Sequence, residues 1–166
     1  RLDALAANRL ALLVYGFEAP GFNTARHIFL DEESRDIYAD WDKCTLDVVG
    51  HLRHSAGRFP DDPLLASLIG ELSMGSERFR VLWSRADVRA RTYGRKAFRH
   101  RVVGELDLHQ ENFAMPCAAG QELVVLTAAV GSEAEANLRL LDGLADAQLG
   151  QDVSAVASTA KTQHNG

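Results

Sequence analysis

The sequence predicts an α+β fold, in which an antiparallel sheet is covered by helices over one face. Apolar residues recur at three- and four-residue steps through the first half of the chain, which is typical of helices. After Asp87 the period shortens to two, which is typical of strands. Strands that follow helices, rather than alternating with them, favour antiparallel pairing over a doubly wound sheet.

Size and composition are those of one globular domain. The chain has 166 residues, 46% of them hydrophobic, and a formal net charge of −5. A domain of this length folds without disulfides or a structural metal. Its two cysteines are far apart, so we expect reduced thiols and a cytoplasmic location. No apolar run is long enough to cross a membrane. The chain begins with Arg1 rather than Met, so we expect that an N-terminal part is missing.

The first elements are short. Arg1–Ala7 alternates well enough for a short strand. Asn8 stands where a helix N-cap belongs, and Gly16 is expected to end that helix. A turn is predicted over Glu18–Asn23, followed by one or two helical turns over Thr24–Leu30.

Three longer helical patterns follow. The best signalled runs from about Glu33 to Ala56, where Gly57 is expected to end it, and its apolar stripe comprises Ile37, Trp41, Cys44, Val48 and Leu52. Asp62 is a predicted N-cap with Pro63 at the first helical position. The expected buried face of that helix consists of Leu64, Leu65, Leu68, Ile69 and Leu72. Ser76 is expected to cap a helix with an inward face of Phe79, Leu82 and Trp83.

The second half predicts the sheet. Val88–His100, broken by Gly94, predicts a strand or an irregular hairpin arm. Val102–Phe113 alternates like a half-buried strand, with Val102, Gly104, Leu106 and Leu108 on one side. After a turn over Met115–Gly120, the run QELVVLTAAV is apolar on both faces, as expected of a central strand.

A last helix is predicted by Ser132 and Glu135, which form a capping box, with Leu138, Leu141 and Leu144 facing inward. Small and polar residues then predict a disordered tail. We therefore expect one domain over residues 1–149 and a tail over 150–166.

The motifs of common enzyme classes are missing from the sequence. It has no nucleophile elbow, phosphate-binding loop, dinucleotide fingerprint or HExxH motif. His51 and His54 could share a helix face, but two histidines without a third ligand indicate solvated surface rather than a metal site. We expect no catalytic residues, no metal and no cofactor.

The segment Glu77–Pro116 carries an excess of positive charge in a net-acidic chain. It contains nine cationic side chains: Arg78, Arg80, Arg85, Arg89, Arg91, Arg95, Lys96, Arg99 and Arg101. Three interpretations stay open: a solvated surface, one or two arginines that hold a carboxylate in a cavity, and contact with phosphate or a partner domain. The acidic balance and the lack of a recognition helix argue against DNA binding by this chain itself.

An ordered series of motifs resembles the C-terminal ligand-binding domain of MmyB-like transcription regulators. The matching pieces are LAAN (Leu5–Asn8), NTAR (Asn23–Arg26), IFLD (Ile28–Asp31), YADW (Tyr38–Trp41), LRHSAGRFPDDP (Leu52–Pro63), GELS (Gly70–Ser73), Phe79, LW (Leu82–Trp83), DVR (Asp87–Arg89), FRH (Phe98–His100), VGELDL (Val103–Leu108), Glu111, Pro116 and ELV (Glu122–Val124). The chain departs from the usual family pattern at Ala86, where a histidine is common, and at His100-Arg101, where His-Pro is common.

The resemblance implies a PAS-like sheet and a sensing role. In the family, the domain follows a helix-turn-helix domain of the XRE class, which we expect to be absent from this chain and to make all contact with DNA. A fatty-acid-like acid would occupy a cavity between the layers and alter DNA binding. Burial of each methylene contributes about 0.8 kcal/mol, so affinity would come from an apolar cavity and orientation from a few polar groups.

For those polar groups we expect Arg26, Asn23 and Asn8, with Trp41 as a wall of the cavity. Each residue also has a simpler interpretation: Asn8 as a cap, Arg26 as an ion-pair partner, and Trp41 as core. An alternative function is a PAS-like interaction module that binds no ligand and forms a homodimer. A small hydrolase or isomerase is the third alternative, for which the sequence offers no catalytic group.

Overall fold

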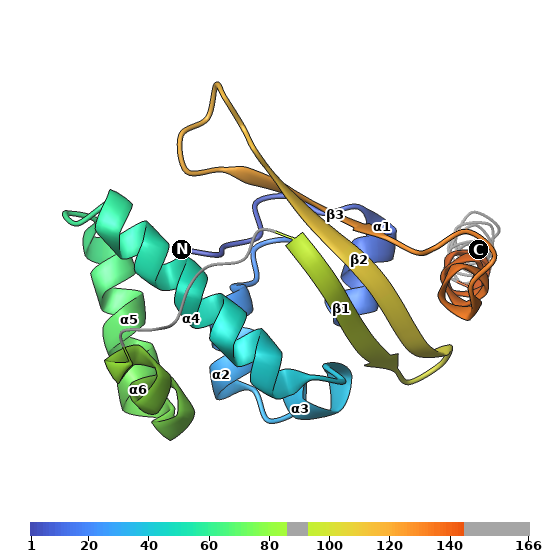
Figure 1. Cartoon of the computed structure of the whole chain (residues 1–166), viewed down its shortest axis with the longest axis horizontal. Coiled ribbons are helices and arrows are strands. Elements are labelled where there is room, and N and C mark those ends of the chain that lie inside the picture. The colour runs from blue at the N-terminus through green and yellow to red at the C-terminus, as the bar shows by residue number, and fades with distance from the viewer. Residues whose placement is uncertain (86–92, 145–166) are drawn as a thin grey trace, which may run out of the picture.

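The computed structural model describes residues 1–85 and 93–144 and confirms the α+β prediction (Figure 1). Its helices are α1 (Arg9–Tyr15), α2 (Thr24–Leu30), α3 (Ser34–Ile37), α4 (Trp41–Arg58), α5 (Pro63–Gly75) and α6 (Glu77–Ser84). Its strands are β1 (Tyr93–His100), β2 (Gly104–Ala114) and β3 (Glu122–Thr127). A further helical segment covers residues 133–144.

The N-terminal segment was predicted as a strand, and this is wrong. Only Asp3 pairs, in an isolated antiparallel bridge with Asn23, and Ala4 donates its N–H to the Phe22 carbonyl. The segment lies against the turn that precedes α2, and Leu2 and Ala4 share three backbone hydrogen bonds with residues 21–24, so the pairing is limited to this one bridge.

Helix α1 begins and ends where local chemistry predicts. The side chain of Asn8 accepts a hydrogen bond from the Ala11 N–H, which satisfies one free donor of the first turn. Gly16 adopts a left-handed conformation with φ of 76° and donates to the Leu13 carbonyl, which ends the helix. Only Val14 of α1 is fully buried.

The single helix predicted from Glu33 to Ala56 is wrong, because the chain breaks between α3 and α4. Tyr38 leaves the helix to form an antiparallel bridge with Phe98 on β1, and Ala39 donates its N–H to the Ala97 carbonyl. Asp40 then restarts the helix, accepting from the Lys43 N–H as an N-cap. The helix also runs past Gly57 to Arg58.

Helices α5 and α6 agree with prediction at their starts. Asp62 accepts from the N–H groups of Leu64 and Leu65, Pro63 occupies the first position, and Ser76 caps α6. Leu65, Leu68, Leu72, Phe79 and Leu82 are buried as expected, and Ile69 and Trp83 pack partly buried against the core. The placement of Leu64 in the buried face is wrong, since it is 61% exposed.

The three strands form an antiparallel sheet in the order β1-β2-β3. Lys96 is opposite Leu108 and Phe98 is opposite Leu106 in the first pair, and Phe113 is opposite Leu123 in the second. Residues 88–92 of the first predicted strand lie outside the described residues. Val102 belongs to the β1–β2 turn and is exposed, not inward as predicted.

The prediction that QELVVLTAAV forms the central strand is wrong. The strand β3 lies at the edge of the described sheet, and β2 is central. Leu123 and Val124 are exposed, although the strand is apolar on both sides. The composition of a segment shows that it is apolar, but it does not show whether other elements cover it in the fold.

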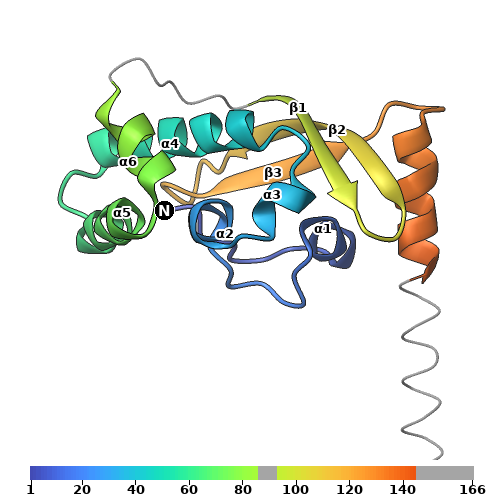
Figure 2. The same ribbon diagram turned by 90° about the horizontal axis from the view of Figure 1, so that it is seen from below.

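The sheet has one covered face. Lys96, Phe98, Leu106 and Leu108 point to the side on which α1, α2 and α3 lie, and Figure 2 shows these helices beneath the sheet. Arg95 and Asp107 alternate with them and form an exposed ion pair on the opposite face. The space between the sheet and α1–α3 is therefore where the layers of the domain meet.

The segment 133–144 packs at the far end of the sheet (Figure 1). The Ser132 side chain accepts a hydrogen bond from the Glu135 N–H, as the predicted capping box requires. The Glu135 side chain accepts from the N–H of Gly131, whereas in a standard capping box it would accept from the N–H of Ser132. Leu141 is buried and Leu138 is partly buried, whereas Leu144 is exposed, contrary to prediction. The predicted tail, 150–166, lies outside the described residues.

Candidate functional site

The two predicted asparagines serve as helix caps. Asn23 is buried and accepts from the N–H groups of Ala25 and Arg26, while its amide donates to the Arg1 carbonyl and the Asp3 carboxylate. Asn8 caps α1 at an exposed position. The hydrogen bonds of Asn23 account for its burial, and they tie α2 to the N-terminal segment.

Arg26 forms a bidentate ion pair with Glu71 on α5. Its Nε and Nη2 atoms lie 2.8 to 3.0 Å from the two carboxylate oxygens. The hydrogen bond raises the pKa of Arg26 and lowers the pKa of Glu71. Both side chains are exposed to solvent, so the pair joins two helices at the surface.

Trp41 lies at the start of α4, and its side chain shares no hydrogen-bond partner with that of Arg26. Its indole N–H donates to the Ile28 carbonyl and the Ser34 hydroxyl. The guanidinium groups of Arg35 and Arg78 lie 4.6 and 5.9 Å from the centroid of its ring. Trp41 therefore connects α2, α3 and α4.

Two surface hollows offer space for a ligand. One, of about 200 Å³, is lined by Arg1, Asp3, Asn23, Arg26, Leu64, Ser67 and Leu68, so it brings together two of the four predicted residues. Neither Asn8 nor Trp41 lines it. Its volume is below the roughly 300–1,000 Å³ of most small-molecule sites.

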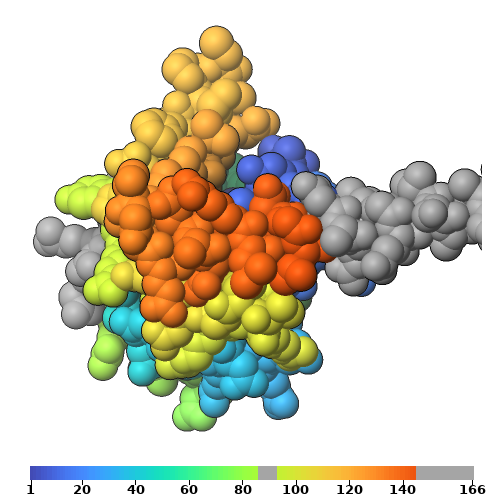
Figure 3. Space-filling model, turned by 90° about the vertical axis from the view of Figure 1, so that its right-hand side faces the viewer, coloured from blue at the N-terminus to red at the C-terminus, as the bar shows by residue number. Residues whose placement is uncertain are grey.

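The second hollow, of about 360 Å³, lies between α1 and the segment 133–144, at the end of the molecule that Figure 3 shows. Leu10, Ala128 and Leu138 give it an apolar floor, beside Thr127, Glu135, Arg139 and Asp142. Arg139 is already paired with Glu135, at 2.7 Å. With a second carboxylate at Asp142, this hollow disfavours an acidic ligand.

A cation lies on the covered face of the sheet. The Lys96 Nζ atom is 5.4 Å from the ring centroids of both Tyr15 and Tyr38 and 5.8 Å from that of Phe98. These rings come from α1, the α3–α4 junction and β1. We call Lys96, Tyr15, Tyr38, Phe98 and His27 the Lys96 cluster.

The ammonium group is charged, and the Asp47 carboxylate is among the groups that raise its pKa. Burial lowers the pKa of Lys96, but the electrostatic influence of Tyr15 and Cys44 and a hydrogen bond to Tyr15 outweigh this effect, so its pKa is raised. Burial raises the pKa of Cys44 itself. None of the ion pairs among the described residues includes Lys96.

Two polar atoms of the cluster have no hydrogen-bond partner. The Tyr38 hydroxyl is one of them, on a residue that is 1% exposed, and burial raises the pKa of Tyr38 well above its ordinary value. The other is the Nε2 atom of His27, whose residue is 7% exposed. Buried polar atoms without partners are uncommon in folded proteins, and each costs stability.

The geometry places these groups together around Tyr38. The centroids of the Tyr38 and His27 rings are 5.8 Å apart, and those of Tyr38 and Phe98 are 5.5 Å apart. His27 Nδ1 is 3.0 Å from Asp31 Oδ2, and because a carboxylate only accepts, Nδ1 must carry the proton of that bond. The cluster therefore combines one cation, one free hydroxyl and one free ring nitrogen within an aromatic surround.

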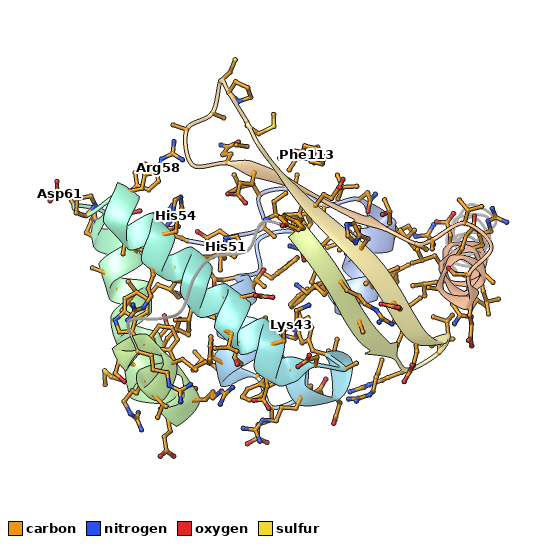
Figure 4. All side chains as sticks on the ribbon, in the orientation of Figure 1. Lys43, His51, His54, Arg58, Asp61 and Phe113 are labelled. Carbon is orange, nitrogen blue, oxygen red and sulfur yellow. The ribbon has the colours of Figure 1, made fainter. Side chains whose placement is uncertain are left out.

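The rest of the basic segment lies mostly at the surface. Arg78, Arg95 and Arg101 form ion pairs with Asp42, Asp107 and Glu33. Figure 4 shows Lys43, His51, His54 and Arg58 along α4, with Phe113 on the β2–β3 hairpin. In the described part of the chain, no three His, Cys, Asp or Glu side chains are grouped as metal ligands.

Sequence reasoning missed Lys96, His27 and Tyr38 as site residues. Lys96 stood in a run of cations that indicated surface, and Tyr38 fell within a helix that does not exist there. One signal was available. In β1, Lys96 is two residues from Phe98, so their side chains point to the same face of the strand, and a lysine therefore occupies the apolar face.

Comparison with known families identifies the domain. Residues 1–141 match the family described as the MmyB-like transcription regulator ligand binding domain. The chain belongs to this family. A search of curated proteins finds no match.

Membership gives the domain a regulatory role. The family is a ligand-binding part of transcription regulators rather than an enzyme family, and its description indicates a small-molecule partner. No helix in the described ranges is both long and apolar enough to cross a membrane.

Proposed function

We propose that this domain senses a fatty-acid-like carboxylic acid inside a bacterial helix-turn-helix regulator. The Lys96 cluster is the observation that carries this proposal. Its ammonium group and the Tyr38 hydroxyl are hydrogen-bond donors that suit a carboxylate, and both residues lie where the sheet meets the helices. Contact with DNA belongs to a helix-turn-helix domain outside this chain.

An acid with an apolar chain fits the surroundings of Lys96 better than a sugar or a nucleotide. Aromatic and aliphatic side chains surround Lys96, including Tyr15, Phe98, Leu106 and Leu108, and Asp47 is the acidic group that acts on it. Each buried methylene contributes about 0.8 kcal/mol, and a hydrogen bond to a charged group contributes about 1.5–3 kcal/mol. The chain would therefore supply most of the affinity, and the carboxylate would fix its orientation.

The acyl chain enters under α1 in this proposal. That helix has seven residues and only Val14 fully buried, while Leu10, Leu13 and Tyr15 pack partly buried against the core. A short helix with few buried side chains separates from the body of a domain at low cost. Its displacement would uncover the Lys96 ammonium, because Tyr15 belongs to α1.

Tyr38 gives binding a route to a structural response. It occupies the break between α3 and α4 and bridges to Phe98 on β1. A ligand that engages the Tyr38 hydroxyl would act on the junction that sets α4 against the sheet. In a regulator, such a shift would change how the domain holds its DNA-binding partner.

Arg26 and Asn23 provide a second candidate position for the carboxylate, because both line the hollow of about 200 Å³. Trp41 and Asn8 would then act only by holding α4 and α1 in place. Binding there requires Arg26 to exchange Glu71 for the ligand. Arg26→Ala tests this position. Unchanged binding of acyl acids would exclude Arg26 as the carboxylate partner, and lost binding would favour Arg26 over Lys96 in that role.

The experiment for the function itself is extraction and mass spectrometry of natively purified protein. We expect a co-purifying acid with an apolar chain. After its removal, we expect a rise in melting temperature that increases with chain length across a series of acyl acids. An empty extract together with no thermal shift across the series would contradict sensing, and would favour an interaction module whose core is filled by its own side chains.

A further inference from the structure

Within residues 1–85 and 93–144, the outer edge of β3 has no backbone partner. Among the backbone hydrogen bonds of the described residues, none joins positions 122–127 to any segment other than β2. Leu123 is 55% exposed and Val124 is 45% exposed, and the run Leu123–Thr127 contains neither a charge nor a proline. Edge strands in proteins that stay monomeric usually carry a charged residue or a proline, which prevents pairing with another strand.

The other edge of the sheet shows the contrast. On β1, the carbonyl groups of Arg95 and Ala97 accept hydrogen bonds from Lys43 Nζ and the Ala39 N–H, and Tyr38 bridges to Phe98. The strand also carries several cationic side chains. One edge is therefore covered by the α3–α4 junction, whereas no described residue covers the other.

Hydrogen-bonded and non-hydrogen-bonded residue pairs alternate between β2 and β3, and this alternation shows which backbone groups of β3 point outward. Met115 donates its N–H to the carbonyl of Gln121, the residue opposite it, so this is a hydrogen-bonded pair. Hydrogen-bonded and non-hydrogen-bonded pairs alternate, and Val124 is opposite Asn112 in the continuing register. Glu122, Val124 and Leu126 therefore direct their N–H and C=O groups away from β2, to the open edge.

We propose that the β3 edge pairs with the β3 edge of a second copy of this chain. In an antiparallel, two-fold arrangement the outward groups of the two strands must face each other, and the centred register that satisfies this places Val124 opposite Val124 of the second copy. Leu126 is then opposite Glu122 of the second copy, and Leu123 is opposite Val125. The two three-stranded sheets join into one continuous sheet.

Self-complementarity favours a second copy over another partner. The single charge of the strand is Glu122 at its start, and the two-fold axis places the two copies of this carboxylate at opposite ends of the ladder. Each then approaches the end of β3 at which Arg139 and Thr127 line a common hollow. Apolar side chains meet apolar ones between these ends, and no like charges face each other directly.

Oligomeric state tests the proposal directly. We expect the parent chain to be a dimer by light scattering and by sedimentation, dissociating over about a hundredfold dilution. Val124→Lys places a charge on the edge strand and should give a monomer with unchanged helical and strand content. Val130→Lys makes the same change at a site that is 95% exposed and beyond the strand, and it should leave the dimer intact.

A cross-link tests the register. In a Cys117→Ser background, Val124→Cys should form a covalent dimer on mild oxidation, because hydrogen-bonded partners have Cα atoms about 5.5 Å apart, within the reach of a disulfide. Val130→Cys should not. A monomeric parent at all concentrations, or a dimer that persists in Val124→Lys, would overturn the proposal. Either result leaves ligand sensing untouched, since that is read from the extract and the thermal series.

Discussion

Tyr38 and Phe98 join the helical part of the domain to its sheet. The two residues form an antiparallel bridge, and the centroids of their rings are 5.5 Å apart. Both side chains are fully buried. Because Tyr38 occupies the break between α3 and α4, this one contact fixes the position at which α4 begins against β1. It also places the centroid of the Tyr38 ring 5.4 Å from the Lys96 Nζ atom.

The Tyr38 hydroxyl should weaken the unliganded domain. Tyr38→Phe removes a buried hydroxyl without a partner, and we expect the free energy of unfolding to rise by about 1 kcal/mol. Tyr38→Ala removes the ring as well and should cost about 3–5 kcal/mol. Urea denaturation of ligand-free protein measures both. A loss of stability in Tyr38→Phe would show that the hydroxyl has a partner in solution.

Ligand binding should not weaken at mildly alkaline pH. The pKa of Lys96 is raised above its ordinary value of about 10.4, so the ammonium stays charged through neutral pH and beyond. We expect the dissociation constant for an acyl acid to be constant between about pH 7 and pH 9. Calorimetric titration measures it. A steady loss of affinity across this range would indicate a lysine with a lowered pKa.

Acid should destabilise the fold through His100. Burial lowers the pKa of this residue, opposed by a hydrogen bond to the Leu13 backbone, and its Nδ1 atom accepts from the N–H groups of Val102 and Val103. With the folded pKa below the unfolded value of about 6.5, the stabilisation is complete above that pH and is lost as the pH falls toward the folded pKa.

The measurement is the free energy of unfolding between about pH 7.5 and pH 5.5, in the parent and in His100→Gln. Because the other histidines are common to both proteins, the difference between the two curves isolates His100. We expect the parent to lose stability more steeply than the variant as the pH falls. Parallel curves would exclude the neutral ring as a source of stability.

The two asparagine caps should differ in what they contribute. Asn8→Ala removes one exposed cap and should cost about 0.5–1 kcal/mol. Asn23→Ala removes two cap bonds and two bonds to the N-terminal segment, all in a buried position, and should cost about 2 kcal/mol. Thermal unfolding of the two variants gives the comparison. Equal losses would mean that the bonds to Arg1 and Asp3 contribute nothing.

Local chemistry made much of the fold predictable. Asn8, Asp62 and Ser76 cap helices with their own side chains, and each acts within three residues along the chain. Such interactions are visible in sequence because they need no distant partner. The break at Tyr38 was not visible, since its cause is Phe98 on a strand far along the chain. The edge position of β3 depends likewise on what covers the strand.

The candidate site was harder to predict than the fold. Asn23 and Arg26 are polar residues near helix starts, which made them candidates, and the structure shows both in contact with other protein groups. Lys96 carries no such signal, because its place on the covered face depends on the parity of β1 and on aromatic rings from α1 and the α3–α4 junction. A cation within a basic run is distinguished from its neighbours only by which face of the strand it occupies.

The most direct test is the binding of dodecanoate and dodecanol to delipidated parent, Lys96→Met and Arg95→Met proteins. Arg95 is adjacent on β1 but faces the opposite, exposed side, so its variant is the matched control. We predict that Lys96→Met binds the acid about tenfold to a hundredfold more weakly and the alcohol as the parent does, and that Arg95→Met changes neither. Undiminished affinity of Lys96→Met for the acid would contradict the assignment of Lys96 as the carboxylate partner.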